Sequence, residues 1–283
     1  MSERKFAVIG HPIGHTMSPF IHRRLFELSG LKGDYSIIDV APEELPVKIK
    51  TLNELDGYNI TIPNKQHIIP FLDKLDPKAQ LYGSVNTVRN SEKREGFTTD
   101  PDGFLMALKA ADIPFEGNVC IIGCGGVART FVYEAALAGC SITIAVRPED
   151  EAVRDALAQE VGDKIEGAKV NTCLISSLEN DCLYPDLLVN ATPVGMFPNT
   201  ERMPVSEKII SRSKYVFDAI YNPLETMLIR KAKEMGIKAV GGMAMLVWQA
   251  VAAHEIWDGA VYNADDISQL ILDSAEEMKR NFK

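Results

Sequence analysis

The chain has 283 residues, of which 46% are hydrophobic and 24% charged, and its formal net charge is −9. This length suggests about two domains that fold without disulfides, and the acidic balance argues against nucleic acid or an acidic membrane surface as a partner. No apolar run is long enough to span a bilayer, and the N-terminus does not resemble a signal peptide. The five cysteines contain no C-x-x-C pair, which is typical of thiols kept reduced. We therefore expect a cytoplasmic protein without a nucleic-acid or membrane partner.

The first predicted elements are a strand over 6–9, a loop over 10–19 rich in Gly and Pro, and a helix that begins at Ser18 and Pro19. Thr16 and Ser18 would then lie at a helix N-terminus, where hydroxyls and backbone N–H groups can bind a carboxylate. The alternative for Ser18 is a plain N-cap.

Three histidines in the loop and the following helix, His11, His15 and His22, suggest a metal site because they follow one another closely. Pro and Gly break any helical face between them, and no acidic residue is near in the sequence. We therefore expect no metal ligands here.

A strand, a turn and a helix start are predicted over 57–65. Asn59 and Thr61 share one face of the strand, and Lys65 follows the turn. A lysine at a helix start opposes the helix dipole, so its position favours a function over a local stabilising role. The preceding elements are a strand over 35–40 and a helix over 42–52.

A further strand is predicted over 83–88, and a hairpin turn over 90–94 leads to Asp100 and Asp102. These two residues suggest paired carboxylates, but the proline between them and the helix that follows over 104–110 make a capping role for one of them an equal alternative.

A glycine-rich turn lies between a short apolar strand and a helix over 131–138, and a second strand follows over 140–146. Gly123, Gly125 and Ala128 fit the pattern G-x-G-x-x-G/A in this context, which predicts a dinucleotide-binding unit with phosphates at the helix N-terminus. The alternative is a tight turn without a ligand.

The charge after the second strand bears on the choice of nucleotide. Arg147 favours the 2′-phosphate of NADP, and Arg154 could assist it, but Glu149, Asp150 and Glu151 would repel a phosphate.

The α/β alternation continues to the C-terminus. The loop with Thr192 follows a buried strand, and in an open α/β sheet such loops face the cofactor. Gln249 lies in the middle of an apolar helix, either as a functional amide or as one bonded to backbone. The predicted elements are helices over 151–161, 226–235, 243–257 and 264–280, and strands over 168–174, 215–220 and 237–240, with a buried strand that ends in a polar loop over 187–196.

Eight motifs, by their joint order and spacing, make the chain similar to the shikimate/quinate dehydrogenase family. The similarity extends from about Ala7 to Leu272. The motifs are the 10–19 loop, Asn59-Ile60-Thr61-Ile62-Pro63-Asn64-Lys65, Ser84-Val85-Asn86-Thr87, Thr99-Asp100, Gly123-Cys124-Gly125-Gly126, Asn190-Ala191-Thr192-Pro193-Val194-Gly195-Met196, Asp218-Ala219-Ile220-Tyr221-Asn222-Pro223 and Met245-Leu246-Val247-Trp248-Gln249.

The resemblance implies an α/β substrate domain over 1–103 and 241–283, a Rossmann-type NAD(P)-binding domain over 104–240, and C-terminal helices that return to the first domain. It implies reversible NADP-dependent reduction of 3-dehydroshikimate to shikimate, with Lys65 and Asp100 as the catalytic pair. It also implies two sets of binding residues. Substrate would contact Thr16, Ser18, Thr61, Asn86, Tyr221 and Gln249, and the cofactor would contact Gly123, Gly125, Gly126, Val127, Ala128, Arg147, Thr192 and Gly242.

The chain departs from the family pattern in places. Thr16 stands for the usual Ser and Thr98 for the usual Asn, and Val146-Arg147-Pro148 replaces Asn-Arg-Thr after the second nucleotide strand. These departures leave NAD as a possible cofactor and a quinate-preferring enzyme as an alternative. An alternative of another class is a regulator that binds nucleotide and metabolite without catalysis. The expected assembly is a monomer or a homodimer.

Overall fold

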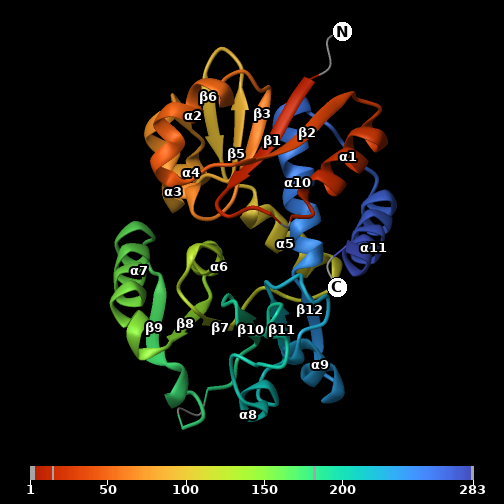
Figure 1. The fold of residues 1–283 in the computed structure, drawn as a ribbon. Coiled ribbons are helices and arrows are strands. Elements are labelled where there is room, and N and C mark those ends of the chain that lie inside the picture. The colour runs from red at the N-terminus through yellow and green to blue at the C-terminus, as the bar shows by residue number, and fades with distance from the viewer. Residues whose placement is uncertain (1–3, 15, 181–182, 282–283) are drawn as a thin grey trace. The chain divides into compact units, whose positions relative to one another are not determined.

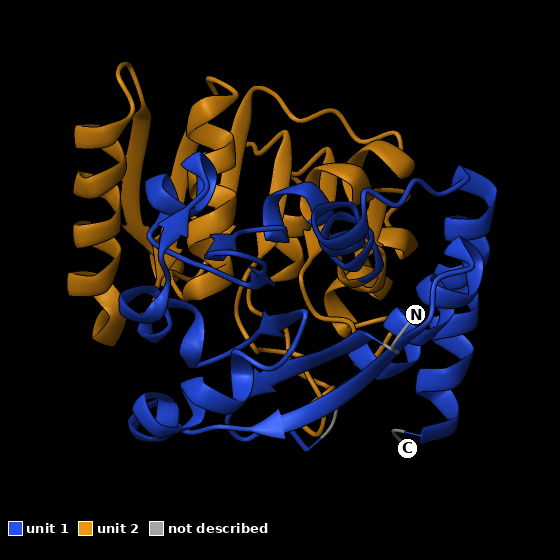
Figure 2. Ribbon diagram, turned by 90° about the horizontal axis from the view of Figure 1, so that it is seen from above, with its two compact units in different colours: residues 1–103, 247–283 blue, residues 104–246 orange. Residues whose placement is uncertain are grey.

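The computed structural model describes residues 4–14, 16–180 and 183–281. The chain forms two compact units, residues 1–103 with 247–283 and residues 104–246 (Figure 2). The second boundary falls inside a helix, a few residues beyond the position 240/241 that the sequence suggested. Each unit has its own sheet (Figure 1).

The first unit is built on a six-stranded mixed sheet in the order β2-β1-β3-β5-β6-β4. The first three of these strands are parallel, and β5 pairs antiparallel with both β3 and β6, which confirms the predicted hairpin. The strands are β1 (Arg4–Gly10), β2 (Gly33–Asp39), β3 (Gly57–Ile60), β4 (Lys74–Leu75), β5 (Thr87–Asn90) and β6 (Arg94–Phe97).

Helices surround this sheet, and the C-terminal ones return to it, as expected. Trp257 on α10 donates a hydrogen bond to the Val88 carbonyl at 2.9 Å, and a side chain at Gly57 would collide with the Trp257 ring. Helix α11 packs against α1 (Figure 1). The helices are α1 (Ser18–Ser29), α2 (Leu45–Leu52), α3 (Asn64–His67), α4 (Pro77–Tyr82) and α11 (Ala264–Asn281), with short 3₁₀ turns η1 (Pro42–Glu44) and η2 (Ile69–Phe71). Two helices, α5 (Asp100–Ala110) and α10 (Met243–Asp258), each contain a boundary between the units.

The second unit has a six-stranded parallel sheet in the order β9-β8-β7-β10-β11-β12. This is the doubly wound order. From β7 the chain adds β8 and β9 on one side of the sheet and then returns to add β10, β11 and β12 on the other side. Strand β10 is buried along its whole length, as expected for a parallel sheet covered on both faces. The strands are β7 (Asn118–Ile122), β8 (Ser141–Val146), β9 (Lys169–Leu174), β10 (Leu187–Asn190), β11 (Tyr215–Asp218) and β12 (Lys238–Gly241).

The remaining elements of this unit are α6 (Gly126–Leu137), α7 (Glu151–Lys164), α8 (Glu207–Ile210), α9 (Met227–Glu234), η3 (Pro148–Asp150) and η4 (Ile175–Ser177). Together the two sheets confirm the α/β fold class with a Rossmann-type unit.

Two local predictions were wrong. The strand expected over 83–88 begins only at Thr87, because Asp76 caps α4 through the Lys78 and Ala79 N–H groups and Gly83 ends that helix at φ +58°. Ser18 is not the N-cap of α1. Met17 occupies that position without a side-chain cap bond, so the Ser18 hydroxyl is left for other partners.

Helices of the described part of the chain are all too short or too polar to cross a membrane.

Candidate active site

Lys65 and Asp100 meet in the first unit. Lys65 is the second residue of α3 and Asp100 the first of α5, and Lys65 Nζ lies 2.5 Å from Asp100 Oδ2. The side chains are 19% and 7% exposed, so water reaches the ammonium but hardly the carboxylate. The charge pair explains how a lysine is tolerated at the start of a helix.

Asn86 holds the other carboxylate oxygen. Its Nδ2 lies 2.9 Å from Asp100 Oδ1 and 3.0 Å from both Thr99 Oγ1 and Gln249 Oε1, and its Oδ1 accepts the Thr99 N–H at 2.7 Å. The amide is 2% exposed, so these bonds fix Asp100 in place. Gln249 therefore bonds to a side chain of the predicted site, rather than to backbone.

The predicted carboxylate-binding hydroxyls form a pair before α1. Thr16 Oγ1 donates to Ser18 Oγ at 3.1 Å and accepts the Ser18 N–H at 3.2 Å. Thr61 follows β3, and its methyl group fills the space beside Gly10, where an added Cβ would lie 2.5 Å away. The structure thus places Thr16, Ser18, Thr61, Asn86 and Gln249 in the same unit as the Lys65–Asp100 pair.

Three further polar residues of this unit bond to one another and were not predicted as site residues: Tyr35, Asn59 and Thr87. Asn59 donates to Thr87 Oγ1 at 3.0 Å and accepts from the Tyr35 hydroxyl at 2.7 Å. The signal for Asn59 was its place on the same strand face as Thr61. Tyr35 gave no signal in the sequence.

The glycine-rich turn lies between β7 and α6 in the second unit. Gly123 has φ +104°, which favours glycine, and an added Cβ there would lie 2.8 Å from Thr192 Cγ2. Gly125 is the N-cap of α6 and Gly126 its first residue, and a Cβ on either would meet no atom within 4 Å. Ala128 is fully buried against the sheet.

This turn fits a dinucleotide. Gly125 and Gly126 are exposed and open, and Val127 beside them is partly buried, so the first N–H groups of α6 are accessible to a pyrophosphate. The turn lies at the switch point of the sheet, where such folds bind their ligands.

Arg147 follows β8 and has acidic neighbours. Its guanidinium bonds Asp150 Oδ2 at 2.9 and 3.0 Å and lies 3.2 Å from Glu149 Oε1, with 63% of its side chain exposed. A 2′-phosphate must therefore compete with two carboxylates for it. Arg154 is buried and bonds Asp155, Glu151 and the Cys173 carbonyl, which argues against the assisting role expected for it.

The loops after β10 and β11 are tied together by a buried carboxylate. Asp218 accepts hydrogen bonds from Asn190 Nδ2 at 3.0 Å, the Ile220 N–H at 3.1 Å and the Thr226 hydroxyl at 2.6 Å. Burial raises the pKa of Asp218 to about 6. Asn190 in turn accepts the N–H and hydroxyl of Thr192, at 3.0 and 2.8 Å.

The remaining predicted contacts belong to this unit as well. Tyr221 follows β11, is partly buried, and has its pKa raised by that burial. A Cβ on Gly242 would lie 2.2 Å from the Ala219 carbonyl oxygen, so packing within the unit already requires glycine there.

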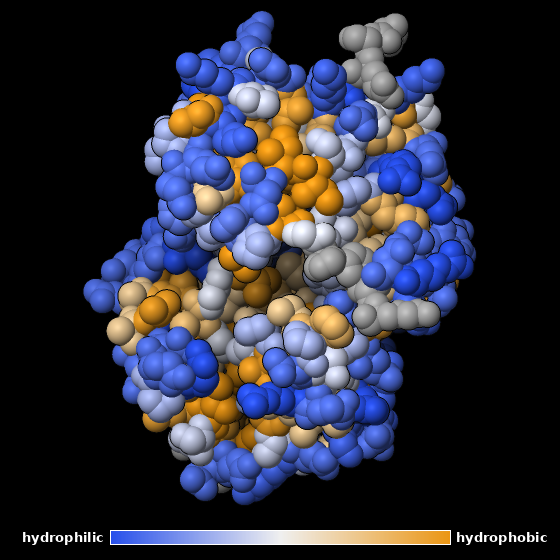
Figure 3. Space-filling view, in the orientation of Figure 1, coloured by the Kyte–Doolittle hydropathy of each residue, from blue (hydrophilic) through white to orange (hydrophobic). Residues whose placement is uncertain are grey.

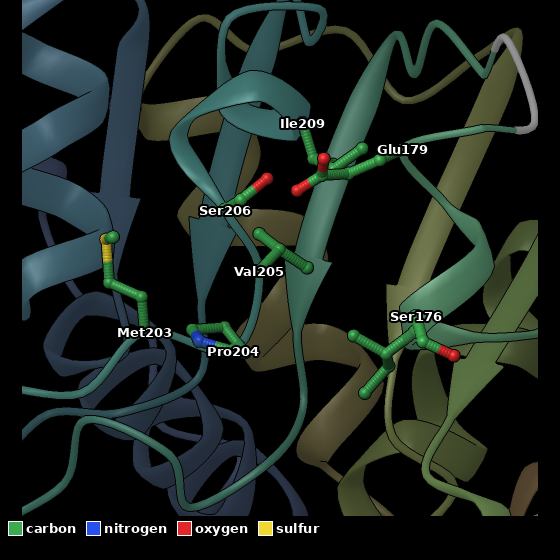
Figure 4. A pocket seen from close by; sticks show the side chains of 8 residues that line it. Ser176, Glu179, Met203, Pro204, Val205, Ser206 and Ile209 are labelled. Atoms are coloured by element: carbon green, nitrogen blue, oxygen red, sulfur yellow. The ribbon is translucent and has the colours of Figure 1, made fainter.

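A surface cavity of about 450 Å³ opens elsewhere in the second unit (Figure 4). Hydrophobic side chains reach the surface in this region, between η4 and α8 (Figure 3). None of the predicted site residues lines it. Its lining is Ile175, Ser176, Glu179, Met203, Pro204, Val205, Ser206 and Ile209.

Within residues 4–14, 16–180 and 183–281, no three His, Cys, Asp or Glu side chains group as metal ligands do. His11 instead bonds Asp39, and His22 bonds His254. His15 lies outside the described residues.

A nucleotide-binding doubly wound sheet in one unit and a lysine–aspartate pair in the other define the class of two-unit α/β dehydrogenases. Residues 8–88 match the family model described as the shikimate dehydrogenase substrate binding domain. The chain is 38% identical over 272 residues to the shikimate dehydrogenase (NADP(+)) of Methanocaldococcus jannaschii, which covers 94% of this chain and 95% of that one. The chain belongs to the shikimate dehydrogenase family.

Solved structures agree with this assignment. Shikimate 5-dehydrogenase from Thermus thermophilus, in complex with NADP(H) and shikimate, is 33% identical with a TM-score of 0.85 and covers 96% of this chain and 99% of its own. Shikimate 5-dehydrogenase from Listeria monocytogenes, in complex with shikimate and NAD, is 31% identical with a TM-score of 0.87 and covers 95% and 96%.

Proposed function

We propose that the chain catalyses the reversible NADP-dependent reduction of 3-dehydroshikimate to shikimate. The observation that carries the proposal is the Lys65–Asp100 pair, 2.5 Å apart at the positions of the family's catalytic motif. The name of two relatives of this chain, shikimate dehydrogenase (NADP(+)), supports the substrate and the cofactor.

The chemistry assigns each group a task. The nicotinamide, when bound, supplies or accepts the hydride. As the substrate carbonyl is reduced, its oxygen gains negative charge, which the Lys65 ammonium stabilises and then protonates. In the reverse direction neutral Lys65 accepts the proton of the hydroxyl. Asp100 holds the amine in position, and Asn86 holds Asp100.

The other site residues divide into substrate contacts and cofactor contacts. Thr16 and Ser18 would bind the substrate carboxylate, and Thr61, Asn86, Tyr221 and Gln249 would surround the ring hydroxyls. The turn with Gly123, Gly125, Gly126, Val127 and Ala128 would hold the pyrophosphate, with Arg147, Thr192 and Gly242 contacting the rest of the cofactor.

The alternatives receive less support. The relatives' names do not favour a quinate-preferring enzyme. A regulator without catalysis would have no need for the charged pair. Cytoplasmic location and a monomeric or homodimeric state stay predictions from the sequence.

A steady-state assay tests the proposal by following the absorbance of the reduced nicotinamide, with shikimate and quinate against NADP and NAD. We expect the highest kcat/KM for shikimate with NADP. A chain that turns over neither substrate with either cofactor would refute the proposal.

A further inference from the structure

Two buried side chains end neighbouring strands of the second unit. Asn190 is the last residue of β10 and Asp218 the last of β11, and the two residues pair across the sheet. Both are 0% exposed, and Asn190 Nδ2 lies 3.0 Å from Asp218 Oδ1. An ionised carboxylate only accepts hydrogen bonds, so the Asn190 amide must turn its NH₂ group toward Asp218. Its oxygen therefore faces the loop that follows β10.

The oxygen of Asn190 holds the start of the loop over 191–195. Asn190 Oδ1 accepts the Thr192 N–H at 3.0 Å and the Thr192 hydroxyl at 2.8 Å. Thr192 Oγ1 in turn accepts the Val194 N–H at 3.2 Å, and Asn190 Nδ2 lies 3.4 Å from the Val194 carbonyl. The orientation of one buried amide thus decides where Thr192 lies.

The same loop touches the glycine-rich turn. The Ala191 N–H donates to the Ile122 carbonyl at 2.9 Å, immediately before that turn. At Gly123 an added Cβ would lie 2.8 Å from Thr192 Cγ2, so the Thr192 methyl group occupies the space beside the turn. The two segments meet at the carboxyl ends of the paired strands β7 and β10, where such folds bind their ligands. A shift of Thr192 would therefore change the space that a nucleotide enters.

Asp218 is held from its other side by uncharged groups. Its Oδ2 accepts the hydroxyl of Thr226, the N-cap of α9, at 2.6 Å, and its Oδ1 accepts the Ile220 N–H at 3.1 Å. Burial raises the pKa of Asp218 to about 6, so the ionised carboxylate costs the fold free energy at neutral pH. A buried carboxylate that is costly for the fold favours a role beyond stability.

We propose that Asn190 and Asp218 are positioning residues for the nicotinamide cofactor, which hold Thr192 and the loop over 191–195 in place against the glycine-rich turn. Asp218 sets the orientation of the Asn190 amide, and Asn190 sets the position of the loop. This inference rests on the proposed function and adds to it two buried residues that touch no reacting atom.

Calorimetric binding of NADP by Asn190→Ala tests the inference, with Ser213→Ala as the matched control. Ser213 is a buried residue before β11, and its hydroxyl donates to the Ile209 carbonyl at 3.0 Å. Each variant loses a buried hydrogen bond of the second unit, but only Asn190→Ala releases the loop. We expect the Kd for NADP to rise on the order of tenfold in Asn190→Ala and to stay within about twofold of wild type in Ser213→Ala. Equal Kd values for the two variants overturn the inference.

Asn190→Asp tests the orientation of the amide, because it keeps the shape of the side chain. The introduced carboxyl lies against Asp218, and one of two adjacent carboxyls has a strongly raised pKa. At pH 9 their repulsion displaces the loop. At pH 6 a shared proton replaces the amide N–H as the donor to Asp218, and the other oxygen still accepts from Thr192. The Kd for NADP, divided by the wild-type value at the same pH, should fall about three- to tenfold from pH 9 to pH 6. A ratio that is the same at both pH values overturns the role of Asp218.

Binding of NADP separates the inference from the proposed function, because it requires no turnover. The Kd for shikimate should stay at the wild-type value in Asn190→Ala, since Thr16 and Ser18 belong to the other unit. A wild-type chain that binds NADP and turns over neither shikimate nor quinate refutes the proposed function alone. An active wild-type chain whose Asn190→Ala variant binds NADP as tightly refutes the inference alone.

Discussion

Lys65 and Asp100 lie 35 residues apart in the chain, yet Lys65 Nζ and Asp100 Oδ2 are 2.5 Å apart. A second pair in the same unit, Lys78 with Asp102, has a distance of 3.2 Å and side chains that are 42% and 44% exposed. Sequence alone left both aspartates as candidates from their residue type. Their surroundings separate them, because Asp100 is buried and bonded by the Asn86 amide, whereas the Asp102 side chain is largely exposed.

Asn86→Ala should reduce both activity and stability. The change removes the donor to Asp100 Oδ1 and the acceptor of the Thr99 N–H, both buried. We expect a loss of about 1–3 kcal/mol in the free energy of unfolding, measured in urea, and a fall in kcat of at least about tenfold. Asn90→Ala is the control, because the Asn90 side chain donates to the Leu52 and Leu55 carbonyls. It should lose stability and keep kcat, and a kcat equal for both variants would remove Asn86 from the site.

Alanine at two glycines of the glycine-rich turn should change different properties, stability at Gly123 and cofactor binding at Gly125. Gly123→Ala places a side chain at φ +104° and against Thr192, so we expect it to lower the free energy of unfolding by about 1–2 kcal/mol. Gly125 has φ −74° and free space around it, so Gly125→Ala should fold with wild-type stability. Its methyl group would occupy the space of the pyrophosphate, and the KM for NADP should rise on the order of tenfold. An unchanged KM in Gly125→Ala would place the cofactor elsewhere.

Asp150→Asn should improve the use of NADP relative to NAD. The substitution releases Arg147 from its ion pair and removes a negative charge near the expected 2′-phosphate. Because exposed ion pairs contribute little, we expect a fall of about two- to fivefold in the KM for NADP and none for NAD. Asp163→Asn, an exposed change further along α7, is the control. If the two variants have the same ratio of kcat/KM for the two cofactors, Arg147 does not contact the phosphate.

Asp218 should make stability depend on pH in a definite direction. Burial raises its pKa from 3.8 to about 6, so the folded state prefers the protonated acid. The resulting stabilisation is complete below pH 3.8 and is lost as the pH rises through 6. Asp218→Asn is neutral throughout, so its free energy of unfolding should rise relative to wild type by about 1–3 kcal/mol between pH 4 and pH 7.

Asp73→Asn is the comparison for this measurement. Arg94 lowers the pKa of Asp73, so its stabilisation is present at neutral pH and is lost on acidification. The free energy of unfolding of Asp73→Asn, relative to wild type, should therefore fall as the pH rises. If it changed with pH in the same direction for Asp73→Asn and Asp218→Asn, the raised pKa of Asp218 would be contradicted.

Much of the fold was predictable from local patterns. The alternation of apolar strands and helices predicted the doubly wound sheet, and Gly123, Gly125 and Ala128 marked the glycine-rich turn between β7 and α6. Helix α4 was missed although Asp76, Pro77 and Gly83 are ordinary start and stop signals, and the strand expected over 83–88 begins only at Thr87.

Residues of the candidate site were predictable where they belong to a sequence motif. Contacts between side chains on different strands were not predictable. Lys65 and Asp100 came from the family motif. The contact of Tyr35 with Asn59 depends on β2 and β3 lying on either side of β1, which no local pattern encodes. The ion pair of Arg147 with Asp150 depends on how η3 turns the chain, so the sequence showed the charges but not their pairing.

Steady-state turnover of shikimate with NADP by Lys65→Met and Lys78→Met tests the acid–base assignment most directly. Both variants remove an ammonium that is paired with an aspartate in the same unit. Loss of a general acid predicts a fall in kcat of roughly 10²–10⁴-fold for Lys65→Met, with Lys78→Met within about twofold of wild type. Equal kcat values for Lys65→Met and wild type would contradict the assignment.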